Sequence, residues 1–210
     1  YIAGWPDGLD LDAAHIYFNE CMKILSARTE QGTMLLEDTI HLPEIHPLLR
    51  GTVDFGWWSK SQGVYLRDYK NGEGVGVAAA GNKQLLYYAF LMIMNDPWLR
   101  AGPRDLLVSL GIVQPNFYGV FEDPDVWETT LGFVMDWGMN ELLPRMNALV
   151  STQDLDEADY VPGDHCQFCP VMLDCPKLRF AFETYASQDE FIEMLKNEEL
   201  SALYALREDA

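Results

Sequence analysis

The chain has 210 residues, 49% of them hydrophobic and 12% aromatic, which predicts one domain with a substantial core and room for a small appendage. The longest strongly apolar run, near 85–94, is too short to span a bilayer, and the start shows no signal peptide. Four cysteines are too few for a disulfide-rich secreted domain, so we expect a cytoplasmic protein without a membrane partner. The net charge of −19, with only 14 Lys and Arg, argues against a simple nucleic-acid binder that relies on a basic surface.

Hydrophobic periodicity and turn signals predict strands and helices in a mixed order after an irregular lead-in at 1–12. In chain order we expect a helix at 13–29 and then three strands, at 33–42, around Asp54 and at 64–70. A helix at 83–95 follows, with Asn82 as its N-cap, and then strands at 106–113 and 117–121. A helix from Pro124 to about Val150 comes next, and Pro144 kinks or splits it. Helical pieces finish the chain. This pattern predicts an α/β fold with a small mixed sheet flanked by helices.

A hairpin between the second and third predicted strands brings the candidate catalytic residues together. The polar turn at 59–63 folds these strands together, which brings Asp54 near Asp68. Lys70 lies two positions beyond Asp68, so both side chains leave the same face of the strand. Two carboxylates with the Tyr69 carbonyl offer the oxygen ligands that Mg²⁺ prefers, and the lysine can position an attacking water. The sequence therefore predicts a hydrolytic metal site.

The same residues resemble a known nuclease superfamily. Asp54 followed by Asp68-Tyr69-Lys70 is similar to the pattern of PD-(D/E)XK nucleases. Gln84 and Tyr88, which share a helix face, resemble the Gln-x-x-x-Tyr of the RecB-like branch. The resemblance implies a restriction-endonuclease-like core that uses Mg²⁺ or Mn²⁺, with this pair contacting nucleic acid or supporting the metal ligands. Core packing of Tyr88 is the alternative.

Further pieces resemble a phage-borne, exonuclease-like RecB family. They are the run 68–75, the stretch 82–85, a Val113-Gln114-Pro115 strand end and late cysteines. The resemblance covers about 35–176 and implies a DNA exonuclease in phage recombination or DNA processing. DNA, single- or double-stranded and entered at an end, is the expected partner, together with a phage recombination or replication protein.

Glu37, on the strand before the hairpin, is a further candidate for the site. It adds an acidic group, placed either beside the metal ligands or at a second metal ion. The alternative is that it is an exposed strand residue. RecB-like nucleases usually carry a histidine ligand on a preceding helix; His15 is the nearby candidate, but its surroundings match poorly, and the family histidine is otherwise expected upstream of Tyr1. Of the adjacent Trp57 and Trp58, strand alternation predicts that one points outward.

The late cysteines Cys166, Cys169 and Cys175, which we call the cysteine module, predict a metal centre. Their spacing resembles part of the iron–sulfur site in several RecB-like nucleases, which implies a [4Fe–4S] cluster. The fourth ligand is then Cys21 or a cysteine upstream of Tyr1, although Cys21 also suits a small buried helix residue. A Zn²⁺ site with His165 is the alternative.

Two domains are therefore expected, a nuclease core at 1–150 and a module at 151–210 packed on it. The leading interpretation is a metal-dependent deoxyribonuclease. The rival is a catalytically inactive nuclease-fold module that binds a protein or a DNA end, which the −19 charge favours.

Overall fold

The computed structural model describes residues 11–71, 76–116, 124–151 and 175. The chain divides into two compact units, Tyr1–Val150 and Ser151–Ala210. The elements below belong to the first unit, and the last of them ends at Ser151. The roles predicted for the two parts of the chain stay predictions.

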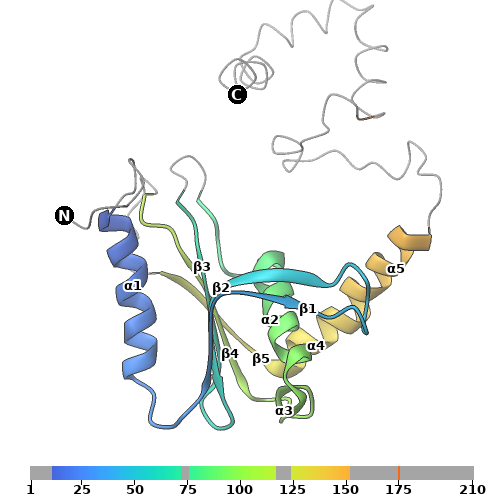
Figure 1. The fold of residues 1–210 in the computed structure, drawn as a ribbon, viewed down its shortest axis with the longest axis horizontal. Helices are drawn as coiled ribbons and strands as arrows, with labels where there is room; N and C mark the ends of the chain where they lie inside the picture. Colours follow the sequence, from blue (N-terminus) through green and yellow to red (C-terminus); the bar gives the residue numbers. More distant parts are fainter. Residues whose placement is uncertain (1–10, 72–75, 117–123, 152–174, 176–210) are drawn as a thin grey trace, which may run out of the picture. The chain divides into compact units, whose positions relative to one another are not determined.

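A five-stranded mixed sheet forms the centre of the first unit (Figure 1). Its order is β1-β2-β3-β4-β5. The strands are β1 (Thr33–His41), β2 (Arg50–Ser59), β3 (Gly63–Tyr69), β4 (Leu107–Val113) and β5 (Asp125–Thr130). Only the β3–β4 pair is parallel, because helix α2 (Lys83–Asn95) carries the chain across between them. The predicted small mixed sheet flanked by helices is confirmed.

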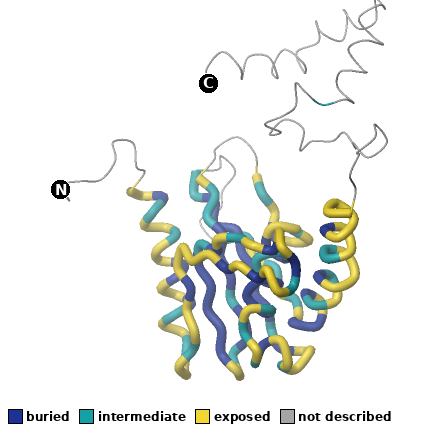
Figure 2. The backbone as a smooth tube through the Cα atoms, turned by 45° about the vertical axis from the view of Figure 1, so that its right-hand side comes forward, coloured by how far each residue is buried: buried dark blue, intermediate teal, exposed yellow. Residues whose placement is uncertain are grey.

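Helices cover both faces of this sheet. Helix α1 (Leu11–Ser26) lies on one side and α2 on the other in Figure 1. The short helix α3 (Pro97–Arg100) follows α2, and the last stretch combines α4 (Leu131–Trp137), the π-helical turn η1 (Gly138–Leu142) and α5 (Leu143–Ser151). Because each face is covered, most residues of the central strands β2, β3 and β4 are buried, as Figure 2 shows.

Helix α2 supplies much of the main core. Seven of its thirteen residues are buried, among them Phe90 and Met92, and each such side chain contributes about 1.5–3 kcal/mol on burial. Its start is fixed by Asn82, whose Oδ1 accepts hydrogen bonds from Gln84 N at 2.9 Å and Leu85 N at 3.2 Å. The predicted helix at 83–95 and its cap are confirmed.

The predicted helix from Pro124 to about Val150 is wrong at its start. Residues 125–130 form β5 at the edge of the sheet, and their exposure alternates along the strand. The run is rich in β-branched and aromatic residues, which favour a strand. Thr130 then caps α4, because its Oγ1 accepts from Phe133 N at 3.2 Å. The strand predicted at 117–121 lies outside the described residues.

The expectation that Trp57 or Trp58 points outward is also wrong. They are only 4% and 5% exposed. Trp57 packs beneath α1 with Arg28 over its ring, while Trp58 Nε1 donates to Asp96 Oδ2 at 2.9 Å on the opposite side. The two side chains point to opposite faces of β2 as expected, but both faces are covered by protein at this position.

Candidate active site

Asp54 and Asp68 meet where the β2–β3 ladder ends. The last paired residues towards this end are Phe55 and Arg67, so the next position in register joins Asp54 to Asp68. Here the Asp54 side chain takes the place of a backbone acceptor in the ladder, because its Oδ2 accepts a hydrogen bond from Tyr69 N at 2.8 Å. The structure thus brings together two carboxylates that 68 − 54 = 14 positions separate in sequence.

Glu37 extends this pair to a third strand. The β1–β2 ladder pairs Asp38 with Val53, so Glu37 lies opposite Asp54 in the same register. Glu37 has a φ of 48°, a left-handed conformation that costs a non-glycine residue on the order of 1–3 kcal/mol. Its pKa is raised because of desolvation first and the nearby Asp54 second. The three carboxylates of Glu37, Asp54 and Asp68, on neighbouring strands, are called the carboxylate row below.

Asp68 is the most deeply buried member of the row, with 2% exposure. Its Oδ2 lies 2.8 Å from Lys70 Nζ and forms an ion pair with it. Burial raises the pKa of Asp68, Lys70 opposes this, and Asp54 adds to it. A buried carboxylate beside a second carboxylate favours positive charge nearby, and Lys70 supplies one such charge.

Lys70 is held in place from α2. Its Nζ donates to Gln84 Oε1 at 2.9 Å, and Gln84 Nε2 donates to Tyr88 OH at 3.1 Å. Gly51 allows this close approach, since a Cβ there would lie 3.0 Å from a ring carbon of Tyr88. The structure therefore joins the predicted residues of β3 and α2 in one chain of contacts from Asp68 to Tyr88.

Tyr17 of α1 lies near the carboxylate row, which the sequence did not reveal. Its hydroxyl is buried, and its ring lies 5.2 Å from that of Tyr69. Its pKa is raised far above the ordinary value by burial first, then by Cys21, Asp54 and Glu37. A tyrosine on a helix is most often a packing residue, so no motif could have singled it out. His15, two positions earlier, is exposed.

The row offers candidate ligands for a cation and does not form a closed site among the described residues. Among the described residues, no three His, Cys, Asp or Glu side chains converge as a ready-made metal site. Asp54 and Asp68 are the side chains that would hold a divalent ion, with the Tyr69 carbonyl as a third candidate. Hard oxygen donors fit Mg²⁺ or Mn²⁺, which keep several waters when bound.

The predicted ligands of the cysteine module cannot be followed as a set. Cys166, Cys169 and His165 lie outside the described residues, while Cys175 is half-buried with a free thiol. Cys21 packs with Ile24 in the small core under α1, and burial raises its pKa to about 11. The shared metal centre stays a prediction.

Comparison with known proteins gives a family without a described activity. A family model described as a protein of unknown function, DUF2800, matches residues 11–210. No curated protein and no solved structure matches the chain. Within the described residues, no helix has the length and apolar character needed to cross a membrane.

Proposed function

We propose that the chain, which belongs to the DUF2800 family, is a Mg²⁺- or Mn²⁺-dependent DNA nuclease of the PD-(D/E)XK, RecB-like type. One observation carries this proposal: the buried Asp68 carboxylate lies opposite Asp54 and forms an ion pair with Lys70 at 2.8 Å. The contacts of Lys70 with Gln84 support it further.

In this function each residue has a definite task. Asp54 and Asp68 would hold the divalent ion, and Glu37 would add negative charge beside them. When bound, the ion would supply positive charge for the phosphoryl oxygens and for the charge that develops during the reaction. Lys70, oriented by Gln84, positions the water whose oxygen forms a bond to phosphorus as the bond to the leaving sugar oxygen breaks.

The strained conformation of Glu37 supports the same location. Left-handed backbone at a non-glycine residue persists only where the surroundings enforce it, and such residues gather at functional sites. The strain lies in the carboxylate row itself.

A catalytically inactive nuclease-fold module that binds a protein or a DNA end is the second candidate. Two observations favour it: the net charge of −19, and the exposed His15, whose surroundings do not match those of the histidine ligand in RecB-like enzymes. Under either candidate, the spacing of the cysteine module supports a [4Fe–4S] or Zn²⁺ site that stabilises the end of the chain.

A cleavage assay tests the proposal. Labelled single- and double-stranded DNA would be incubated with Mg²⁺, Mn²⁺ or EDTA. Asp68→Asn and Lys70→Ala should each lower metal-dependent cleavage by about 100-fold or more. The matched controls are Asp105→Asn and Lys60→Ala, which change exposed residues at the other end of these strands and should cleave like the wild type.

Two outcomes would contradict the proposal. Cleavage at the wild-type rate by purified, folded Asp68→Asn would remove the site assignment. No cleavage by the wild type with either metal would favour the inactive module.

A further inference from the structure

A groove lies beside the carboxylate row. Its volume is about 430 Å³, and it lies between the start of β2, the first turns of α2 and the turn η1. Gln84 and Tyr88 line it, and Gln84 is the residue that contacts Lys70. A molecule in the groove would therefore be next to the candidate active site.

Positive charge borders this groove in a strongly acidic chain. Arg50, Lys83 and Arg145 line it together with one acidic residue, Glu141, and the three cations are exposed. Among the described residues, no carboxylate pairs with Arg50 or Lys83, and Arg145 reaches only Glu141, at 3.9 Å. An exposed pair at that distance contributes little. The three cations are thus available to an anion, which the −19 charge of the whole chain would otherwise repel.

Three aromatic rings also line the groove. Tyr87, Tyr88 and Trp137 are half-buried around the groove. The Tyr87 ring is fixed, because its hydroxyl donates to Arg50 O at 2.7 Å and accepts from Arg50 N at 3.1 Å. Rings held in this way can stack on nucleobases of any sequence, whereas the bases of a duplex are already stacked on one another.

We propose that this cationic groove, formed by Arg50, Lys83, Arg145, Tyr87, Tyr88 and Trp137, binds unpaired nucleotides of single-stranded DNA. Its volume is that of a pocket enclosing a small ligand, which suits an unpaired nucleotide rather than a section of duplex. The cations contact phosphates and the rings stack on bases. The inference rests on the proposed nuclease function and names its substrate class.

Binding without cleavage tests the groove separately from catalysis. Fluorescence anisotropy of a labelled oligothymidylate would be measured in EDTA over a range of salt concentrations. Three phosphate contacts predict a slope of about −2 in a plot of log affinity against log salt, since each contributes about −0.7 for single strands. This slope should therefore be shallower by about 1.4 for the double variant Arg50→Gln/Arg145→Gln.

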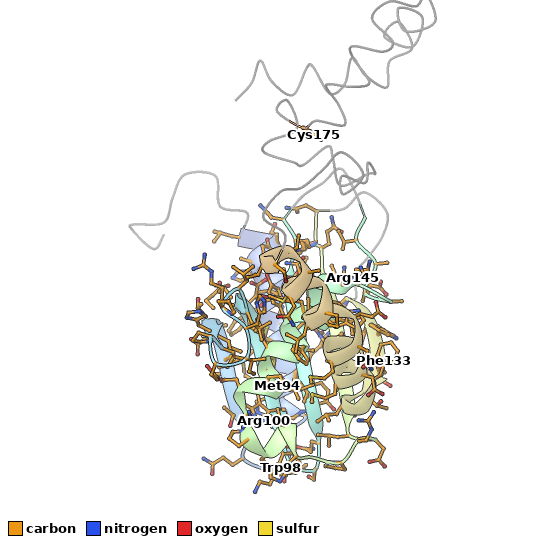
Figure 3. All side chains as sticks on the ribbon, turned by 90° about the vertical axis from the view of Figure 1, so that its right-hand side faces the viewer. Met94, Trp98, Arg100, Phe133, Arg145 and Cys175 are labelled. Carbon is orange, nitrogen blue, oxygen red and sulfur yellow. The ribbon has the colours of Figure 1, made fainter. Side chains whose placement is uncertain are left out.

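A matched control and a second variant guard against indirect effects. Figure 3 shows Arg145 and Arg100 towards opposite ends of the first unit, and Arg100 is likewise exposed. Arg100→Gln should keep the wild-type affinity and slope, while the slope for Lys83→Gln alone should be shallower by about 0.7. An abasic strand of equal length should bind the wild type on the order of tenfold more weakly, because it cannot stack.

The outcomes separate the two proposals. An unchanged affinity and slope in the double variant, or tighter binding of duplex than of single strand by the wild type, would overturn the groove. Cleavage of duplex without single-strand binding would keep the nuclease and reject the groove. Single-strand binding that depends on these cations, without cleavage in any metal, would keep the groove and reject the nuclease.

Discussion

Replacing Glu20 with alanine tests how α1 is held on the sheet. Glu20 and Arg67 form a buried ion pair, with Arg67 Nε 2.9 Å from Glu20 Oε1 and exposures of 8% and 5%. The pair joins α1 to the centre of β3. Since α1 also carries Tyr17 towards the carboxylate row, loss of the pair would affect both stability and the site.

The magnitude follows from the surroundings of Arg67. Removing one partner of a buried pair costs about 3–5 kcal/mol, because the other charge stays buried. Arg67 would keep hydrogen bonds to Leu66 O at 2.9 Å and Ser109 O at 3.3 Å. These satisfy donors but do not neutralise the charge, so we expect a loss near the lower end, about 3 kcal/mol. For a chain of this length that lowers Tm by about 6–12 °C.

Thermal and urea unfolding of Glu20→Ala would be compared with Asp136→Ala. Asp136 pairs with Arg104 at the surface, where both side chains are more than 60% exposed, so its loss should cost at most about 1 kcal/mol. Hydrogen exchange in α1 should accelerate only in Glu20→Ala. If the two variants lose the same stability within about 1 kcal/mol, the buried pair does not hold α1 and the reasoning is wrong.

Three further predictions follow from the site, a helix cap and the cysteine module. Mg²⁺ at 100 times its Kd should raise the free energy of unfolding by about 2.7 kcal/mol and Tm by about 5–11 °C. Asp54→Asn should reduce this shift in thermal denaturation. No shift in the wild type would contradict a cation site. Burial opposes ionisation of Asp96, but hydrogen bonds from Trp58, Leu99 and Trp98 outweigh it and lower its pKa. The stability that this carboxylate contributes is therefore present above its ordinary value of 3.8 and lost as pH falls through the lowered pKa. Denaturant unfolding from pH 5 downward should show less acid sensitivity in Asp96→Asn, and equal sensitivity would contradict the assignment. Anaerobically purified protein should contain iron and sulfide with broad visible absorbance; zinc alone would replace the cluster, and metal-free folded protein would exclude the centre.

Local patterns were sufficient to predict the hairpin and helix α2. The turn at 59–63 and the alternation at 64–70 predict β2 pairing with β3, as the structure has it. Asn82 before an apolar run predicts the start of α2. These signals work because turn and cap residues act on backbone groups a few positions away. The approach of Asp54 to Asp68 follows from the same hairpin.

Distortion and long-range burial were beyond those patterns. Leu35 and Ile40 both reach the main core, although 40 − 35 = 5 positions should place them on opposite faces. The face changes around Glu37, whose positive φ breaks the alternation. Arg67 likewise resembles an exposed strand residue until α1 brings Glu20 over it. The burial of Arg67 depends on a partner remote in sequence, and neither feature is detected by periodicity.

The acidic composition also gains a physical meaning from the placement of charge. Three carboxylates on adjacent strands repel a phosphate unless a divalent ion lies among them, whereas Arg50, Lys83 and Arg145 attract it at the neighbouring groove. If the proposed function holds, DNA affinity comes from few cations and from the metal, not from a broad basic surface. Binding should then be weakly salt-dependent for a nuclease and stronger with a divalent ion present. A composition that argues against nonspecific binding is thus compatible with a local site for one unpaired strand.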